Sequence, residues 1–163
     1  MKILYFGGQK SGKSSLAEAK ALALATDKPY YLATYDHSFG DDEMGERIDR
    51  HRTARGEHFI TLEETRHLAD VIQPHQTYLI DCVSMWILNR LDESEETLLA
   101  EIEALGRVDA NIVFVLNDVG SGVIPNDPIS RRYVDLSGII GQALARFCDE
   151  VYEVKLGLEK RLK

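Results

Sequence analysis

The feature that most constrains this chain is a glycine-rich loop close to its amino end. An apolar run, KILYF (2–6), leads directly into GGQKSGKSS (7–15), and an Ala- and Leu-rich stretch continues to residue 25. The apolar run favours a buried strand, and the composition after the loop favours a helix, predicted over 13–25. A strand, a glycine-rich loop and a helix in this order are the setting in which phosphate-binding loops occur.

The loop matches the phosphate-binding pattern G-x-x-x-x-G-K-[ST]. The matching residues are Gly7, Gly12, Lys13 and Ser14. Glycines allow the loop to turn so that backbone N–H groups point at phosphate oxygens, and the amino end of the following helix adds partial positive charge. Lys13 is expected to reach the β- and γ-phosphates, and the Ser14 hydroxyl is expected to hold magnesium. The sequence therefore predicts a nucleoside triphosphate site, and a Gly/Ser turn that matches by chance is the alternative.

A carboxylate at the end of another apolar run fits the same site. The run TYLIDC (77–82) reaches its polar end at Asp81. P-loop proteins often place an acidic residue there, near the magnesium ion or its waters. We favour this role for Asp81, and a simple strand-end position is the alternative. The chain has no Asn-Lys-x-Asp motif for reading guanine, so local chemistry leaves the choice of base open.

The rest of the chain alternates between apolar runs and helical patterns. Further strands are predicted at 29–34, 77–82, 111–117 and 150–155, and further helices at 94–107 and 128–148. Runs that are apolar on both faces, with helices between them, are typical of a parallel sheet covered on both sides. No linker or repeat interrupts the pattern. We therefore predict that residues 1–163 form a single P-loop NTPase-like (RecA-like) α/β domain, with three layers and a mostly parallel central sheet of about five core strands.

Each of the two later predicted helices has a candidate capping residue at its start, and the second helix contains two glycines. Asp92 or Ser94 can cap the first of these helices, and Asp127 can cap the second. Gly138 and Gly141 lie inside the second helix, where each costs about 1 kcal/mol relative to alanine. Close packing of another backbone is the simplest reason for glycine there.

Charge and composition exclude several classes of protein. The formal net charge is -8, whereas nucleic-acid binders need a clustered excess of Lys and Arg. No run approaches the roughly 18 apolar residues of a membrane span, and glycines interrupt the amino-terminal run too early for a signal peptide. Cys82 and Cys148 lie in apolar surroundings that suit reduced thiols. We therefore expect a cytoplasmic protein with no nucleic-acid partner and no membrane insertion.

A row of charged residues surrounds one histidine. In DDEMGERIDRHRTAR (41–55), Glu43, Arg47, His51 and Arg55 are four residues apart and would share one face of a helix. A neutral imidazole can attack phosphorus, and guanidinium groups can neutralise the oxyanions of a triphosphate and lower the pKa of His51. A solvated face of alternating charge explains the same residues without any chemistry. The residues alone support the two interpretations equally.

Several segments together resemble one enzyme family. They are GGQKSGKS (7–14), YLAT (31–34), DDEMGERIDRHRTAR (41–55), TLEE (61–64), LIDCVSMWILNRL (79–91) and NDVGSGVIPNDPISRRYVDLSGIIGQALA (117–145). In this order they resemble the bifunctional adenosylcobinamide kinase/adenosylcobinamide-phosphate guanylyltransferase family of cobalamin biosynthesis. The resemblance covers essentially the whole chain, and its most specific parts are D-x-E-M-x-x-R-I-x-x-H and V-G-x-G-x-x-P.

The resemblance implies two reactions at one nucleotide site. The enzyme would phosphorylate the hydroxyl of adenosylcobinamide with ATP or GTP, and would then transfer GMP from GTP to adenosylcobinamide phosphate with release of pyrophosphate. The family histidine maps onto His51, which would carry GMP as a covalent intermediate. The resemblance also implies a homotrimer of P-loop α/β subunits.

The expected nucleotide contacts fall into four groups. The loop binds phosphates for the physical reasons given above, whereas the contacts of residues 34–36 and of Glu63 rest on the resemblance alone. The groups are Gly7, Gly8, Gln9, Lys10, Ser11, Gly12, Lys13 and Ser14 in the loop; Thr34, Tyr35 and Asp36 after the second strand; Arg52, Thr53, Ala54 and Arg55 beside the histidine; and Glu63 with Asp81. The chain departs from the family pattern at Asp118, where Glu is usual, and at Gly141, where Asn is usual. A P-loop small-molecule kinase without guanylyl transfer, or a nucleotide-dependent regulatory module, is the alternative function.

Overall fold

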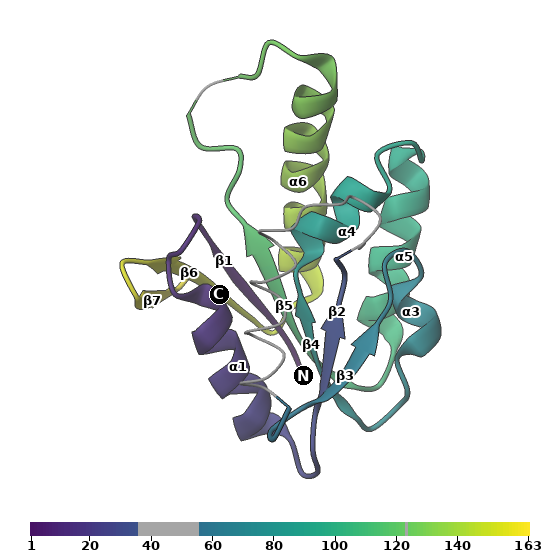
Figure 1. Cartoon of the computed structure of the whole chain (residues 1–163), viewed down its shortest axis with the longest axis vertical. Helices are drawn as coiled ribbons and strands as arrows, with labels where there is room; N and C mark the ends of the chain where they lie inside the picture. Colours follow the sequence, from purple (N-terminus) through teal and green to yellow (C-terminus); the bar gives the residue numbers. More distant parts are fainter. Residues whose placement is uncertain (36–55, 123) are drawn as a thin grey trace.

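The computed structural model describes residues 1–35, 56–122 and 124–163, which build a seven-stranded sheet (Figure 1). The strands are β1 (Lys2–Gly7), β2 (Tyr30–Ala33), β3 (Ile60–Glu63), β4 (Thr77–Asp81), β5 (Asn111–Asn117), β6 (Glu150–Lys155) and β7 (Leu158–Arg161). Their order in the sheet is β3-β2-β4-β5-β1-β6-β7. Every neighbouring pair is parallel except β6 and β7, which are antiparallel. The predicted α/β fold with a mostly parallel sheet is confirmed.

Helices cover both faces of this sheet. They are α1 (Lys13–Leu24), α3 (Leu68–Val71), α4 (Val83–Asn89), α5 (Glu95–Arg107) and α6 (Pro128–Phe147). Successive side chains of a strand point to opposite faces, and β1 shows the result. Ile3 and Tyr5 pack in one core with Ala17 of α1, whereas Leu4 packs in the other core with side chains of the remaining helices. The predicted three layers are therefore present.

The five predicted strands are confirmed, but about five strands was an underestimate. β3 is a four-residue edge strand whose residues are all at least partly exposed, and every residue of β7 is exposed. The β7 sequence, LEKR, carries no apolar alternation that indicates a strand. These two strands are defined by their pairing with a neighbour: β3 pairs with β2, and β7 pairs with β6.

Both predicted helix caps are present. The Ser94 side chain accepts a hydrogen bond from the Thr97 N–H at the start of α5, so Ser94 and not Asp92 is the cap. The Asp127 carboxylate accepts hydrogen bonds from the Ile129 and Ser130 N–H groups at the start of α6. These caps fix where the two helices begin.

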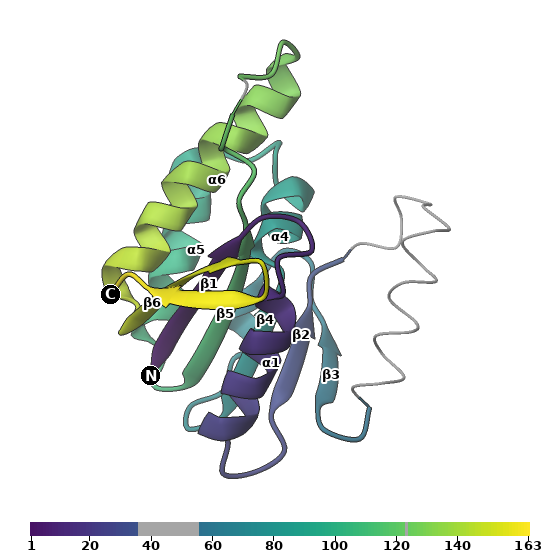
Figure 2. The same ribbon diagram turned by 90° about the vertical axis from the view of Figure 1, so that its left-hand side faces the viewer.

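The predicted close packing of another backbone is found at neither α6 glycine among the described residues. A Cβ on Gly141 would lie 3.1 Å from the Leu116 Cδ2 atom of β5, so this glycine does permit close packing, against a side chain. A Cβ on Gly138 would meet nothing within 4 Å among the described residues. Gly138 therefore faces open space. Figure 2 shows that one end of α6 extends beyond the sheet.

The parallel strands bring several sequence-distant residues to one edge of the sheet, here called the carboxyl edge. Gly7 lies opposite Asn117, and Ala33 lies opposite both Glu63 and Asp81. In open parallel sheets, ligands bind outside the carboxyl ends of the strands. None of the helices in the described ranges is long and apolar enough to span a bilayer.

Candidate nucleotide-binding site

The glycine-rich loop joins β1 to α1 at the carboxyl edge, and a neighbouring hairpin sets its shape. Gly12, at the amino end of α1, has φ 98°, a left-handed conformation that favours glycine. A Cβ on Gly12 would lie 3.1 Å from the Cα atom of Gly157, in the turn between β6 and β7. The Gly157 N–H donates a 2.8 Å hydrogen bond to the Ser11 carbonyl. A Cβ on Gly7 would collide with the Val154 carbonyl of β6, so both glycines are required by close contact with this hairpin.

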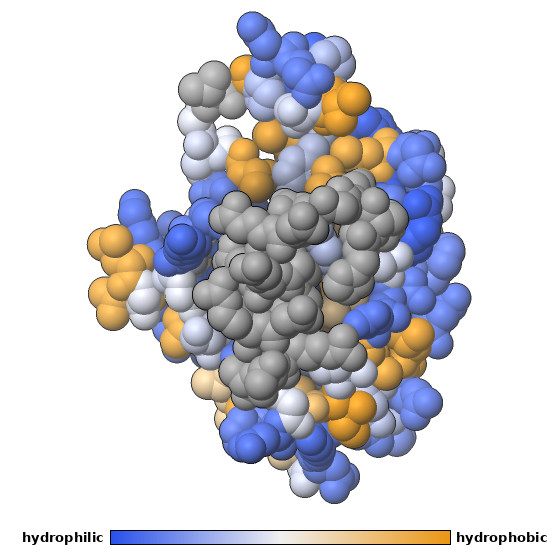
Figure 3. Space-filling view, in the orientation of Figure 1, coloured by the Kyte–Doolittle hydropathy of each residue, from blue (hydrophilic) through white to orange (hydrophobic). Residues whose placement is uncertain are grey.

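The hairpin also places apolar side chains beside the loop. Leu156 is 88% exposed and Leu158 is 75% exposed. Figure 3 shows apolar surface, in orange, at this hairpin. The phosphate-binding loop is thus flanked on one side by an apolar rim.

Two polar groups of the loop, on Lys13 and Ser11, are buried, whereas the side chains of Gln9 and Lys10 are exposed. Lys13 is only 6% exposed, and its Nζ atom donates a 3.1 Å hydrogen bond to the Gly8 carbonyl. The Ser11 Oγ atom is buried and has no hydrogen-bond partner among the described residues. A buried hydroxyl without a partner costs about 1–3 kcal/mol, and a phosphate oxygen would supply the missing acceptor. An ammonium group, a hydroxyl donor and the amino end of α1 together form an arrangement that can bind a polyphosphate.

Asp81 lies at the end of β4, which is separated from the loop strand β1 by β5. Its Oδ2 atom accepts a 3.0 Å hydrogen bond from the Tyr31 hydroxyl. Burial, together with the nearby Asp81 charge, raises the pKa of the adjacent Cys82 thiol to about 12, while Lys13 opposes the shift. Asp81 and Lys13 therefore both act electrostatically on this thiol, and Cys82 stays protonated at neutral pH.

The donor atoms at this edge fit a magnesium ion that shares its ligands with a nucleotide. Magnesium prefers oxygen ligands and is commonly held by one or two protein groups together with substrate phosphates. The Ser14 hydroxyl and the Asp81 carboxylate are such groups. Within residues 1–35, 56–122 and 124–163, no cluster of three or more His, Cys, Asp or Glu side chains could hold a metal by itself.

Three further predicted contact residues also reach the carboxyl edge. Thr34 is completely buried, and its hydroxyl donates to the Cys82 carbonyl and accepts from the Cys82 N–H. Tyr35 is half-buried, and Glu63 is exposed at the end of β3. The hydroxyl of Thr34 is thus engaged with β4, and nucleotide contacts by these residues stay predictions.

The remaining predicted residues lie outside the part of the chain that the structure describes. They are Asp36, His51, Arg52, Thr53, Ala54 and Arg55, together with the helix predicted around them at 41–55. The choice between a catalytic His51 and a solvated charged face is therefore open in the structure.

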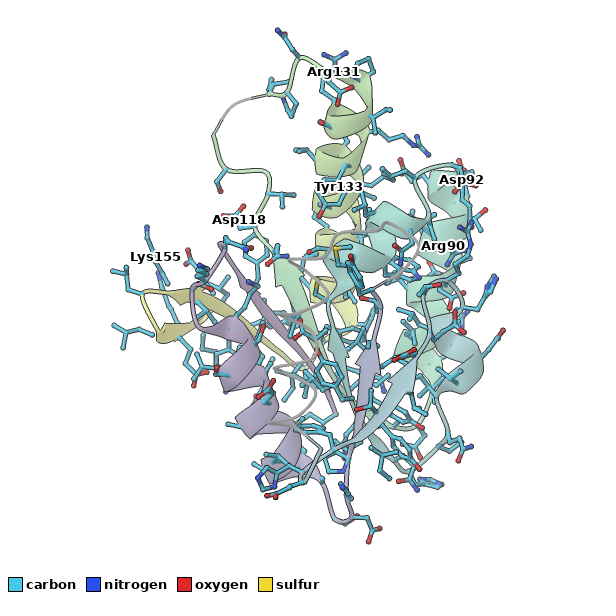
Figure 4. The ribbon with its side chains drawn as sticks, in the orientation of Figure 1. Arg90, Asp92, Asp118, Arg131, Tyr133 and Lys155 are labelled. Atoms are coloured by element: carbon cyan, nitrogen blue, oxygen red, sulfur yellow. The ribbon has the colours of Figure 1, made fainter. Side chains whose placement is uncertain are left out.

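Two features of the site were missed in the sequence. Asn89, the last residue of α4, donates hydrogen bonds to the Thr34 and Thr65 carbonyls. Gly157 contacts the phosphate-binding loop although about 145 residues separate it from Gly12. The glycine in KLGLEK favours a turn, but no local signal in the sequence indicates that this turn contacts the phosphate-binding loop. Asp118 lies near the loop as well (Figure 4), since its N–H donates a 2.9 Å hydrogen bond to the Gly7 carbonyl.

Fold and site together define a P-loop nucleotide-binding protein of the α/β class. The sequence profile of the family described as cobinamide kinase / cobinamide phosphate guanyltransferase matches residues 3–162. The chain belongs to this family of transferases, which confirms the resemblance and the enzyme class predicted from the motifs.

Relatives and a solved structure agree with this assignment. The chain is 40% identical over 177 residues to the "Bifunctional adenosylcobalamin biosynthesis protein CobP" of Pseudomonas aeruginosa, covering 100% of this chain and 98% of the relative. It is 35% identical over 185 residues to the "Bifunctional adenosylcobalamin biosynthesis protein CobU" of Escherichia coli, covering 100% of both. A structure of "a prototypical ATPase from the type III secretion system of pathogenic bacteria" superposes with a TM-score of 0.52 at 13% identity. The match covers 98% of this chain and 56% of that one, and it supports the fold alone.

Proposed function

We propose that this chain catalyses two successive transfers at the carboxyl edge: phosphorylation of adenosylcobinamide, and then transfer of GMP to adenosylcobinamide phosphate. The observation that carries the proposal is the glycine-rich loop with buried Lys13, in a chain of the cobinamide kinase / guanyltransferase family. The Ser11 hydroxyl of this loop is buried and has no partner within residues 1–35, 56–122 and 124–163. This arrangement suits a substrate with several phosphates.

In the first reaction, the substrate hydroxyl attacks the γ-phosphorus of ATP or GTP and loses its proton. The bond from the γ-phosphorus to the bridging oxygen breaks, and the nucleoside diphosphate leaves. Lys13 and the loop N–H groups stabilise the charge that spreads over the transferred phosphoryl oxygens. Magnesium, when bound to Ser14 and Asp81, supplies further neutralisation of phosphate charge.

In the second reaction, an imidazole nitrogen of His51 attacks the α-phosphorus of GTP, and pyrophosphate leaves. The phosphate of adenosylcobinamide phosphate then attacks the same phosphorus, which yields adenosylcobinamide-GDP and restores free His51. Neighbouring Arg52 and Arg55 disfavour a protonated imidazole, so the attacking nitrogen is available at neutral pH. The nucleotide contacts of Tyr35, Asp36 and Glu63 belong to the same proposal.

The proposal includes the cellular and quaternary setting. Residues 1–163 act as a single nucleotide-binding domain, and three copies assemble as a homotrimer, as the family resemblance implies. Both cysteines are free thiols, and burial raises the pKa of each to about 12. Such inert thiols fit a cytoplasmic location.

A labelling experiment tests the second reaction. The protein is incubated with GTP radiolabelled at the α-phosphate, and the protein band is examined for label. We expect an acid-labile, alkali-stable adduct, as a phosphoramidate requires, and mass spectrometry should place an added GMP on His51. His51→Ala should lose the adduct, while His75→Ala, at the opposite end of the sheet, should retain it.

The outcomes separate the proposal from its alternatives. Normal phosphorylation of cobinamide with no protein adduct would support a kinase without guanylyl transfer. Nucleotide binding without consumption of GTP in the presence of cobinamide would support a regulatory module. Either result would contradict the two-reaction proposal.

A further inference from the structure

A single buried side chain, Asn89, ties together the carboxyl ends of β2 and β3. It is the last residue of α4 and is 8% exposed. Its Nδ2 group donates a 2.7 Å hydrogen bond to the Thr34 carbonyl and a 3.0 Å hydrogen bond to the Thr65 carbonyl. Thr34 directly follows β2, and Thr65 lies just beyond β3. One amide group therefore holds the two segments at a fixed separation.

Thr34 extends the connection to β4. Its hydroxyl donates to the Cys82 carbonyl over 2.8 Å and accepts from the Cys82 N–H over 3.0 Å. Cys82 directly follows Asp81, the end of β4. The ends of three strands are thus connected through hydrogen bonds that a helix-borne amide completes.

Asn89 itself is held by a partly buried charged network. Arg66 donates a 2.8 Å hydrogen bond from its guanidinium to the Asn89 carbonyl, and the Arg66 carbonyl accepts from Trp86 Nε1 and from Arg90. Arg90, 2% exposed, pairs with Glu93 and lies over the Trp86 ring. Figure 4 shows Arg90 at the end of α4. Since these groups fix the backbone of Asn89, its amide can act as a rigid anchor.

The Asn89 side chain makes its contacts through its N–H groups and not through its oxygen. Both of its N–H groups bind backbone carbonyls, whereas Oδ1 is buried and has no partner among the described residues. An apolar side chain of similar size would remove the two donors and leave both carbonyls buried without them. A buried polar group that loses its partner costs about 1–3 kcal/mol and tends to move.

We infer that Asn89 is a positioning residue for the nucleotide site. It sets Tyr35 and Glu63 relative to the phosphate-binding loop by fixing the segments that carry them. Thr34 directly precedes Tyr35, and Thr65 lies two residues after Glu63. Thr34 serves the same purpose through its hydroxyl, as a link between β2 and β4. The inference rests on the proposed function, because Tyr35 and Glu63 are nucleotide contacts only in that proposal.

The test compares two asparagines of one sheet. Asn89→Leu removes the anchor at the carboxyl edge. Asn111→Leu removes an asparagine at the other end of the sheet, whose side chain bonds to Thr77 and to the amino terminus. We expect Asn89→Leu to raise the KM and the Kd for GTP roughly tenfold, with kcat at saturating GTP changed by less than about threefold. Asn111→Leu should lower the melting temperature and leave the KM for GTP unchanged.

A second set of variants covers the case in which Asn89→Leu does not fold. Thr34→Val removes the hydroxyl without changing the shape of the side chain, and Thr34→Ser keeps the hydroxyl. We expect Thr34→Val to weaken GTP binding roughly tenfold, and Thr34→Ser to recover most of that loss. If both positions act on one segment, the combined Thr34→Val and Asn89→Leu variant loses less than the product of the two single effects.

The outcomes distinguish this inference from the proposed function. Wild-type protein that fails to bind GTP would remove the proposed function. Wild-type protein that binds GTP, together with variants of Asn89 and Thr34 that bind it equally well, would overturn the positioning role alone. A drop in melting temperature without a change in KM would show that Asn89 is structural.

Discussion

The two buried lysines of this protein, Lys2 and Lys13, show how differently the two ends of the sheet are built. Lys2, at the amino end of β1, is 7% exposed and donates hydrogen bonds to the Val108 and Ala110 carbonyls over 2.7 and 2.8 Å. Lys13 is 6% exposed, and its one described hydrogen bond to a carbonyl, that of Gly8, is 3.1 Å long. The first lysine joins neighbouring segments, whereas the second is presented within a loop shaped for phosphate.

The surrounding polar groups follow the same division. At the amino end, the Asn111 side chain accepts from the terminal amine of Met1 and donates to Thr77. At the carboxyl edge, Ser11 Oγ is buried without a partner among the described residues. The Asn111 side chain is thus engaged in contacts within the protein, whereas the Ser11 hydroxyl is available to a ligand. The following substitutions test that contrast, from the largest expected effect to the smallest.

Substitution of Lys13 should lower activity, whereas substitution of Lys2 should lower stability. Lys13→Ala should reduce phosphoryl transfer about 10²–10³-fold, because the transferred charge loses its fixed ammonium group. Lys2→Met should leave turnover intact and lower the free energy of unfolding by about 1–3 kcal/mol, because two buried carbonyls lose their donor. Initial rates and urea titrations of both variants measure these effects. Equal losses of activity in the two variants would contradict the division.

The glycine before α1 should be nearly as sensitive. Gly12→Ala combines a left-handed backbone with a contact 3.1 Å from Gly157, so we expect GTP affinity to fall roughly tenfold and stability to fall by about 1–3 kcal/mol. Gly122→Ala is the matched control, because Gly122 also has positive φ, 128°, but open space around it. The Gly122→Ala variant should lose only the stability that backbone strain costs, without the contribution of a close contact. Similar losses in both variants would mean that the hairpin contact does not matter.

Acid should weaken the network that Glu93 forms with Arg90 and Arg66. Hydrogen bonding to Arg90 lowers the pKa of Glu93 below its ordinary value of 4.5. This stabilisation is complete above about pH 4.5 and is lost as the pH falls through the lower folded pKa. Glu93→Gln should therefore cost about 1–2 kcal/mol near pH 7 and less at about pH 3.

The control for this experiment is the His75–Asp109 pair, whose side chains are 80% and 86% exposed. Asp109→Asn should change the unfolding free energy little, because exposed pairs are weak. Urea unfolding at both pH values gives the comparison. A pH-independent effect of Glu93→Gln would show that its charge does not contribute.

The smallest effects are expected at the α6 glycines. Gly138→Ala should stabilise the protein by up to about 1 kcal/mol, because the added methyl group meets open space and alanine favours the helix. Gly141→Ala gains the same helix preference but must move Leu116, so its net effect should lie near zero. Thermal melts measure both. A destabilised Gly138→Ala variant would indicate that another molecule packs against this face of α6.

Much of the fold was predictable because its signals are short in sequence. The phosphate-binding loop, the Ser94 and Asp127 caps and the five core strands each depend on residues within one strand or one helical turn. β3 and β7 were missed for the same reason, since edge strands are defined by a neighbour and carry little apolar pattern. The same holds for the candidate site. The phosphate-binding loop was predictable from the sequence, whereas the hydrogen bonds that Thr34 makes with Cys82 and Asn89 were not.

The sequence by itself determined the class of protein, through a local strand-loop-helix pattern whose residue types fix its chemistry, and it indicated the family through ordered motifs. Only the tertiary structure decided which side chains are engaged and which are available. The hydroxyl of Thr34 is committed to Cys82, and its carbonyl is committed to Asn89. These contacts join residues about fifty positions apart, and such pairings arise only when strands and helices pack together.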